Sequence, residues 1–275
     1  MNSLISSNNL LLQWALLLLH LIPLPLMILA NLGESSSISR SWPAVSLQAR
    51  KISWLLIGLI ALLSGLAGLL YLGTPDHKAM AVAMLLGAVP AGLMLWPRFR
   101  LALSRLMPID PESPLHGIAV ALSAVFVAYS AGSALSEGLQ SALSNPQHLQ
   151  FWDLLFSEAP FLLAAVIGVG FLIRRSGHET RLRLGLTKPS WIQALLGLFC
   201  AGIFFTFSNG TDLLAQHLTP GLSQQINTVS NDLFGSLSRQ PLGIVAIALS
   251  AGIAEEIFFR GALQPRLGIF WTAVV

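Results

Sequence analysis

Long apolar runs are the feature that most constrains how this chain can fold. A helix needs roughly 20 apolar residues to cross the hydrocarbon core of a membrane, and seven runs in the sequence are about that long. Of all residues, 54% are hydrophobic and only 10% are charged, whereas soluble domains carry about 25% charged residues. We therefore expect an all-α, polytopic transmembrane helical bundle with seven spans and the start of an eighth at Gly268. The expected spans are residues 10–32, 52–73, 79–96, 115–135, 153–173, 190–208 and 242–262.

The first of these runs is expected to be a retained helix and not a cleaved signal peptide. No Lys or Arg precedes it, it is longer than a signal-peptide core, and no small-residue cleavage site follows it. Its segment "IPLPL" predicts a kink. His20 lies in this run, and we interpret it as a hydrogen-bonded packing residue. The single Cys200 allows no internal disulfide and is interpreted as a small hydrophobic residue in a helix.

Lys and Arg residues concentrate in alternate loops. Of the 15 in the chain, all but Lys78 and Arg239 fall in residues 33–51, 97–114 and 174–189 or at the end of the seventh run. Because cytoplasmic loops of membrane proteins are enriched in Lys and Arg, the alternation predicts an N-terminus outside and these loops in the cytoplasm. We expect a multi-pass protein of the bacterial plasma membrane. The same distribution accounts for the net charge of +3 without a nucleic-acid partner.

Residues 209–240 are predicted to lie outside the spans. The sequence "NGTD" at their start is typical of a turn. Apolar residues then recur three and four positions apart, which predicts an amphipathic helix at the outer membrane interface. A packed polar loop is the alternative. The apolar positions are Leu222, Ile226, Val229, Leu233 and Leu237.

The chain divides into two regions by its motifs. Residues 1–150 form an N-terminal membrane region of four spans in which no motif is recognised. Residues 151–275 contain the later spans and a cluster of charges in the seventh. We therefore expect any chemistry in residues 151–275.

Three charged residues lie within the seventh span, where ionisable side chains are costly and usually functional. Glu256 and Arg260 are four residues apart with the acid first, which is the favourable order for an ion pair on a helix. Glu255 lies about 100° around the helix from Glu256, so it has no partner on its own helix. The spacing predicts one partnered carboxylate and one that is free to act as a general base. The alternative is a buried ion-pair cluster that locks the packing of helices.

The string "EEIFFRGALQPRLG" resembles the first motif of the CPBP family, also called Abi. This family includes CAAX prenyl endopeptidases and bacteriocin-processing or immunity proteins. Its pattern is E-E-x-x-x-R, commonly with an aromatic pair before the Arg and a Gly after it. Phe258, Phe259 and Gly261 occupy these positions here. The resemblance is confined to the C-terminal part of the chain and implies that residues 151–275 are a CPBP-like membrane protease region, incomplete at its C-terminal end.

The resemblance implies a glutamate-dependent intramembrane endopeptidase. Catalytic Glu255 would activate water for attack on a peptide bond, and Glu256 and Arg260 would support and orient it. The family also has two later motifs, F-x-x-x-H and a histidine with Asn or a small polar residue four positions on. No histidine follows His217 in this sequence. We therefore expect a chain truncated after its first motif, with an incomplete and inactive site.

Two other functions remain open at this stage. One is a non-enzymatic membrane protein, such as an immunity or scaffold pseudoenzyme. The other is a small proton-coupled transporter with carboxylates that relay protons, although the acids cluster on one helix and no second half mirrors it. The expected partners are membrane lipid and a peptide or protein substrate of unknown identity. No metal or other cofactor is predicted, because the chain has no H-E-x-x-H motif.

Overall fold

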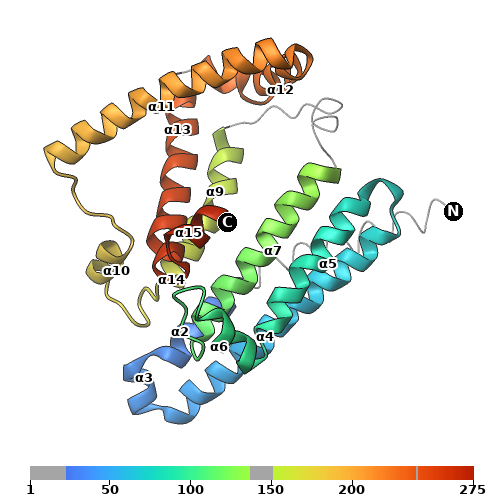
Figure 1. Cartoon of the computed structure of the whole chain (residues 1–275). Helices are drawn as coiled ribbons and strands as arrows, with labels where there is room; N and C mark the ends of the chain where they lie inside the picture. Colours follow the sequence, from blue (N-terminus) through green and yellow to red (C-terminus); the bar gives the residue numbers. More distant parts are fainter. Residues whose placement is uncertain (1–22, 137–150, 240) are drawn as a thin grey trace.

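The chain is built from helices in the computed structural model, which describes residues 23–136, 151–239 and 241–275 (Figure 1). No β-strand occurs among these residues, so the expected all-α class is confirmed for them. The helices are α2 (Pro23–Glu34), α3 (Ser36–Ser41), α4 (Pro43–Leu72), η1 (Pro75–His77), α5 (Lys78–Leu93), α6 (Pro97–Leu103), α7 (Pro114–Ser136), α9 (Phe151–Gly168), α10 (Gly177–Arg183), α11 (Trp191–Leu218), α12 (Pro220–Ser238), α13 (Pro241–Glu256), η2 (Ile257–Leu263), α14 (Gln264–Leu267) and α15 (Ile269–Val274).

Helices α4, α5 and α7 pack side by side as a close bundle (Figure 1). Gly68 of α4 lies so near α5 that an added Cβ would be 2.9 Å from the carbonyl oxygen of Ala81. At Gly132 of α7, an added Cβ would be 3.0 Å from the Cα of Met80. Small residues at such contacts let helix backbones approach each other where lipid supplies no hydrophobic driving force.

Helix α5 covers the expected span at residues 79–96 as far as Leu93, and the chain then bends into the helix α6 in the expected loop. Helix α5 has 16 residues, which gives a length of about 24 Å, and α6 then continues at an angle of 100° to it. Pro97 explains the break, because the residue before a proline avoids the helical conformation. Trp96 accordingly has an extended backbone, with φ −90° and ψ 115°.

The expected span at residues 153–173 ends earlier than its hydropathy predicted. Helix α9 stops at Gly168, and its described apolar part, Glu158–Gly168, is short. Gly170 has a φ of 90° and Leu172 a φ of 61°. The chain therefore reverses in a turn with left-handed conformations, which glycine adopts at little cost.

The turn predicted at "NGTD" is wrong, because α11 runs through it without a break. Asn209 Nδ2 donates a hydrogen bond to the carbonyl oxygen of Phe205 at 2.7 Å, and Thr211 Oγ1 donates to that of Ser208 at 2.8 Å. These side chains bond to the preceding helical turn, so the helix continues past them. The amphipathic helix predicted to follow is confirmed as α12, and the polar-loop alternative is wrong.

Helices α11 and α12 lie next to each other across one end of the molecule, away from the α4–α5–α7 bundle (Figure 1). None of the most apolar segment of α11 is buried by the described chain. Phe204, Phe205 and Phe207 are all about 70% exposed. An apolar helix this open leaves its surface for lipid or another apolar molecule to cover.

The seventh expected span, residues 242–262, changes helix type along its length. Helix α13 ends at Glu256, and residues Ile257–Leu263 form the π-helix η2. Within η2, a Cβ added at Gly261 would lie 2.9 Å from the Cα of Leu184, so only glycine fits this contact. Gly268, with a φ of 82°, ends α14, and α15 begins where the eighth run was expected.

Three helices in the described part of the chain, α4, α7 and α11, are long and apolar enough to cross a membrane. They correspond to the expected spans at residues 52–73, 115–135 and 190–208. The bent pair α5–α6 makes a fourth if it is counted as one span. Most of the first expected span, residues 10–32, lies outside the described residues. These helices are those of a membrane protein, and the count of seven spans stays a prediction.

One hydrophobic core extends across residue 150, where the sequence was divided. It contains Leu26, Ile60 and Met84 from the first region and Leu263 and Leu267 from the second. Helix α2 packs on α9, and α14 packs on α7. The division into two regions stays a prediction, but this packing holds the segment after the charged motif against the N-terminal bundle.

Candidate functional site

Glu256 and Arg260 form the ion pair that their spacing predicted. Glu256 Oε2 lies 2.8 Å from Arg260 Nε. Their side chains are 52% and 74% exposed, so the alternative of a buried cluster that locks helices together is wrong. An exposed pair contributes about 0–1 kcal/mol to stability. The pair therefore orients its two side chains more than it stabilises the fold.

Glu255 is exposed at the end of α13 and has no hydrogen bond or ion pair with any other described residue. This agrees with the free carboxylate expected from helix geometry. Ala254, the residue before it, is only 1% exposed, so this turn of α13 packs inward through a small side chain. The two carboxylates lie beside that contact, on the open side of the helix. The catalytic role of Glu255 stays a prediction.

Glu158 of α9 is a further member of the site that the sequence reasoning missed. Its carboxylate lies within electrostatic range of Glu255. Its Oε2 atom is buried and has no hydrogen-bond partner among the described residues. The signal was present in the sequence, because "LLFSEAPFLL" places an acid in an apolar run just as "GIAEEIFF" does. The acids therefore belong to two packed helices and not to one.

The aromatic pair of the motif fixes how η2 packs on α9. The ring of Phe258 meets that of Phe161 edge to face, with centroids 5.3 Å apart, and meets Phe259 in the same way at 5.2 Å. Such pairs add about 0.5–1.5 kcal/mol beyond the burial of their surfaces. Phe161 lies one helical turn after Glu158 on α9. This contact therefore sets the register that brings Glu158 toward Glu255.

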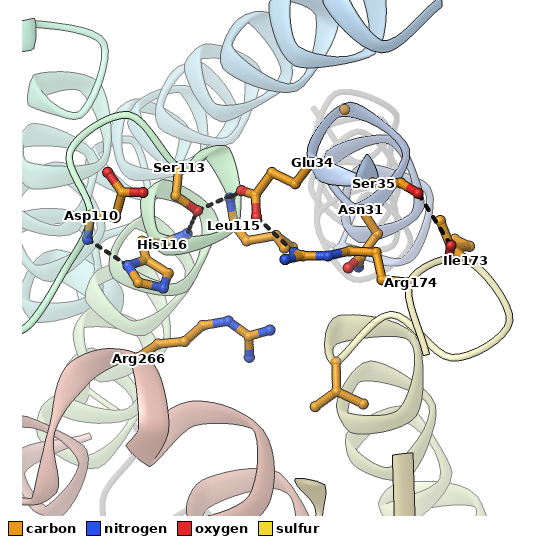
Figure 2. A network of polar contacts seen from close by, with 12 residues as sticks. Asn31, Glu34, Ser35, Asp110, Ser113, Leu115, His116, Ile173, Arg174 and Arg266 are labelled. Atoms are coloured by element: carbon orange, nitrogen blue, oxygen red, sulfur yellow. Dashed lines mark hydrogen bonds and ion pairs between the residues drawn. The ribbon is translucent and has the colours of Figure 1, made fainter. Parts of the chain in front are cut away.

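A polar network around Glu34 joins helices from both regions (Figure 2). Glu34 Oε2 lies 2.7 Å from Arg174 Nη1. Glu34 Oε1 accepts hydrogen bonds from Ser113 Oγ at 2.5 Å and from the backbone N–H of Leu115 at 3.2 Å. The second bond also puts a carboxylate at the N-terminus of α7, where the helix dipole favours it. We interpret this network as a structural anchor between α2, α7 and the turn after α9.

Arg266 of α14 is buried beside this network, with 8% of its surface exposed. Its Nη2 donates to the carbonyl oxygen of Gly168 at 2.8 Å, and its Nη1 donates to that of Ala262. Burial lowers the pKa of Arg266 to about 10; nearby Arg183 also lowers it, and Glu34 opposes the shift. The guanidinium therefore remains charged at neutral pH.

The described histidines form no catalytic cluster with these residues. His116 Nδ1 accepts a hydrogen bond from the backbone N–H of Asp110 at 2.6 Å, and the ring of His77 stacks on Tyr71. His20 lies outside the described residues. Across residues 23–136, 151–239 and 241–275, no three His, Cys, Asp or Glu side chains are placed to hold a metal ion.

Comparisons of the chain with protein-family models, with curated proteins and with solved structures found no match. The site is therefore interpreted from its own residues. They comprise a free carboxylate at Glu255, the adjacent Glu256–Arg260 pair, and a partly buried carboxylate at Glu158.

Proposed function

We propose that this chain is an intramembrane endopeptidase of the CPBP type in which Glu255 activates water. The observation that carries this proposal is the difference between the two adjacent acids. Glu256 is paired with Arg260 at 2.8 Å, whereas Glu255 has no partner among the described residues. A general base needs a carboxylate that is free to take a proton. The resemblance of "EEIFFRG" to the family's first motif supports the same assignment.

In the proposed reaction, Glu255 takes a proton from a water molecule as the water oxygen attacks the carbonyl carbon of a peptide bond. The tetrahedral intermediate then collapses, the C–N bond breaks, and the leaving nitrogen receives the proton from Glu255. The products are a carboxylic acid and an amine. Glu256 and Arg260 orient the base. In the family a histidine of a later motif helps to stabilise the oxyanion, and no histidine follows His217 in this sequence.

The proposal includes a topology. The chain crosses the membrane seven times with its N-terminus outside, so Glu255 acts near the cytoplasmic face. The segregation of Lys and Arg into alternate loops supports this orientation. Cys200 is the only cysteine, so a Cys200→Ser background allows single cysteines in place of Arg105 and Arg239 to be labelled in intact cells. An impermeant thiol reagent should label the cysteine at 239 and not the one at 105; the reverse pattern overturns the orientation.

Peptide cleavage tests the enzyme directly. Because these 275 residues lack the family's later histidine motifs and are expected to be inactive alone, the chain extended through those motifs is incubated in detergent with a library of quenched fluorescent peptides, with and without a prenyl group. Glu255→Gln should lower turnover by about 10²–10⁴-fold and leave the melting temperature unchanged. Glu112→Gln, in an exposed loop, is the matched control. Cleavage by the Glu255→Gln variant at the parent rate would remove Glu255 as the base.

A second function, proton relay, is favoured by the proximity of Glu158 to Glu255. Carboxylates on two packed membrane helices are an arrangement that relays protons in transporters, and the sequence alone had placed the acids on one helix. In proteoliposomes with an internal pH dye, proton flux that is lost in Glu158→Gln and in Glu255→Gln would support the relay. Peptide cleavage that survives Glu158→Gln would support the protease. If neither activity is found, the non-enzymatic membrane protein is the remaining function.

A further inference from the structure

An elongated apolar cavity of about 360 Å³ lies between α2, α7, α9, η2 and α14. This volume is in the range of ordinary ligand sites, about 300–1,000 Å³. The side chains that line it are mainly aliphatic and aromatic. They include Met27, Ile118, Leu122, Phe126, Phe161 and Phe258.

The cavity has the length of a lipid tail. Leu115 and Tyr129 of α7 both line it, and the 14 residues from one to the other correspond to about 21 Å of helix at 1.5 Å per residue. A tail that crosses one leaflet covers half of the hydrocarbon core, about 15 Å. One acyl chain therefore fits along α7 within the cavity.

Arg266 is the only charged side chain among the described residues that line this cavity. No carboxylate in the described part of the chain lies within ion-pair distance of its guanidinium. Two of its five N–H groups are satisfied, by the carbonyl oxygens of Gly168 and Ala262. Each Nη atom thus has an acceptor, and no Arg266 nitrogen is among the buried atoms of the described residues that lack a hydrogen-bond partner. Burying a cation without a counterion is costly, so this position calls for an anion.

The charges around Arg266 also favour an anion. Among the largest electrostatic influences on it, those of Arg183, Arg175 and Arg174 act in one sense and that of Glu34 acts in the opposite sense. Glu34 is already engaged by Arg174. Figure 2 shows the Arg266 side chain extending beside His116 and the Glu34–Arg174 pair, with no hydrogen bond or ion pair to either. No carboxylate of the described residues therefore forms an ion pair with Arg266 at this end of the cavity.

We propose that the cavity binds an anionic membrane lipid, with one acyl chain along α7 and the phosphate head group at Arg266. Basic pockets between membrane helices are known sites for anionic head groups. The apolar walls favour an acyl chain, and the buried guanidinium of Arg266 favours a negatively charged head group. The site does not depend on Glu255 or on peptide cleavage.

The test is lipid binding by the full chain purified in a neutral detergent. Dipalmitoyl phosphatidylglycerol is titrated against dipalmitoyl phosphatidylcholine and against soluble glycerol phosphate, with thermal unfolding and native mass spectrometry as readouts. We expect phosphatidylglycerol alone to raise the melting temperature and to be retained as a one-to-one complex. Arg266→Gln should weaken binding by about 10–100-fold, as expected for loss of a charge-assisted hydrogen bond. Arg105→Gln, an exposed arginine in the loop after α6, should bind like the parent.

A second variant keeps the test decisive if Arg266→Gln fails to fold. Leu122→Trp narrows the apolar cavity and leaves Arg266 in place, so it should also lose phosphatidylglycerol. Equal retention of phosphatidylcholine would overturn the proposal, as would unchanged binding by the Leu122→Trp variant. Equal stabilisation by glycerol phosphate would overturn the lipid assignment in favour of a free anion.

Discussion

The α4–α5–α7 bundle and helix α11 are both apolar helices with polar side chains embedded in them, but they satisfy these side chains differently. In the bundle, Ser64 Oγ of α4 donates to the carbonyl oxygen of Met84 in α5 at 2.9 Å. In α11, Thr206 Oγ1 donates to the carbonyl oxygen of Gly202, four residues earlier in the same helix. Ser64 thus joins two neighbouring helices of the bundle, although Ser53 Oγ bonds within α4, whereas the hydroxyl of Thr206 stays within α11.

The difference shows in which part of the molecule the sequence itself specifies how the helices pack. In the bundle, glycines and serines specify one close arrangement of three helices. The glycines of α11 make no such close contact with the described residues, and its apolar side chains are exposed. The environment of α11 is therefore determined by the lipid or other apolar molecule that covers it. The charged motif lies between these two regions, with Phe258 packed toward α9 and its ion pair open to the other side.

Glycine substitutions should give the largest difference in stability between the α4–α5–α7 bundle and α11. Gly68→Ala forces a Cβ to within 2.9 Å of a backbone oxygen of α5, and overpacking of this kind costs about 1–3 kcal/mol. Gly202→Ala in α11 meets nothing within 4 Å and gains up to about 1 kcal/mol of helix propensity. Thermal unfolding in detergent should show a lower melting temperature for the first and an equal or higher one for the second. Equal losses in both would show that α11 is packed as closely as the bundle.

The Glu34–Arg174 and Glu256–Arg260 ion pairs should also differ in their contribution to stability, but by less than the two glycine substitutions. Glu34 and Arg174 have side chains that are 17% and 27% exposed, and Glu34 also holds Ser113 and the N-terminus of α7. Glu34→Ala leaves these groups without an acceptor, so we expect a loss of about 1–3 kcal/mol. Glu256→Ala removes an exposed pair and should cost less than about 1 kcal/mol. Denaturant unfolding of both variants measures this difference, and a larger loss from Glu256→Ala would contradict it.

The smallest effect is expected at α10, in the connection between the two regions. Ser176 caps this helix, and its backbone N–H and hydroxyl both bond to the Glu179 carboxylate. The backbone bond, followed by the hydroxyl bond, lowers the pKa of Glu179. Because the folded-state pKa is lowered, the stabilisation is present above the unfolded value of about 4.3 and is lost as the pH falls through the folded value.

Amide hydrogen exchange in α10 measures this cap. Ser176→Ala should speed exchange about fivefold, which corresponds to a cap of roughly 1 kcal/mol. The difference in exchange rate between the parent and the Glu179→Gln variant should become smaller as the pH is lowered below 4 to 5. A difference that is independent of pH would show that the ionised carboxylate contributes nothing to the cap.

Local features of the site were predictable from sequence, and contacts between helices were not. The Glu256–Arg260 pair follows from a separation of four residues on one helix. Glu158 was missed because its proximity to Glu255 depends on how α9 packs against α13, through Phe161 and Phe258. Arg266 was counted only among the basic residues at the end of the seventh run, because its burial depends on segments about 100 residues earlier in the chain, such as Gly168.

The sequence by itself determined that the chain is apolar and that its described residues are helical, because hydropathy over about 20 residues is a local property of the chain. It therefore placed α4, α7 and α11 and the start of α15. Only the tertiary structure decided where the other runs break and which polar groups meet. The break before Pro97 has a local cause in the proline, whereas the reversal at Gly170 and the π-helix after Glu256 were not indicated by the hydropathy. The cavity that ends at Arg266 arises only where five separate segments come together, so no single stretch of sequence encodes it.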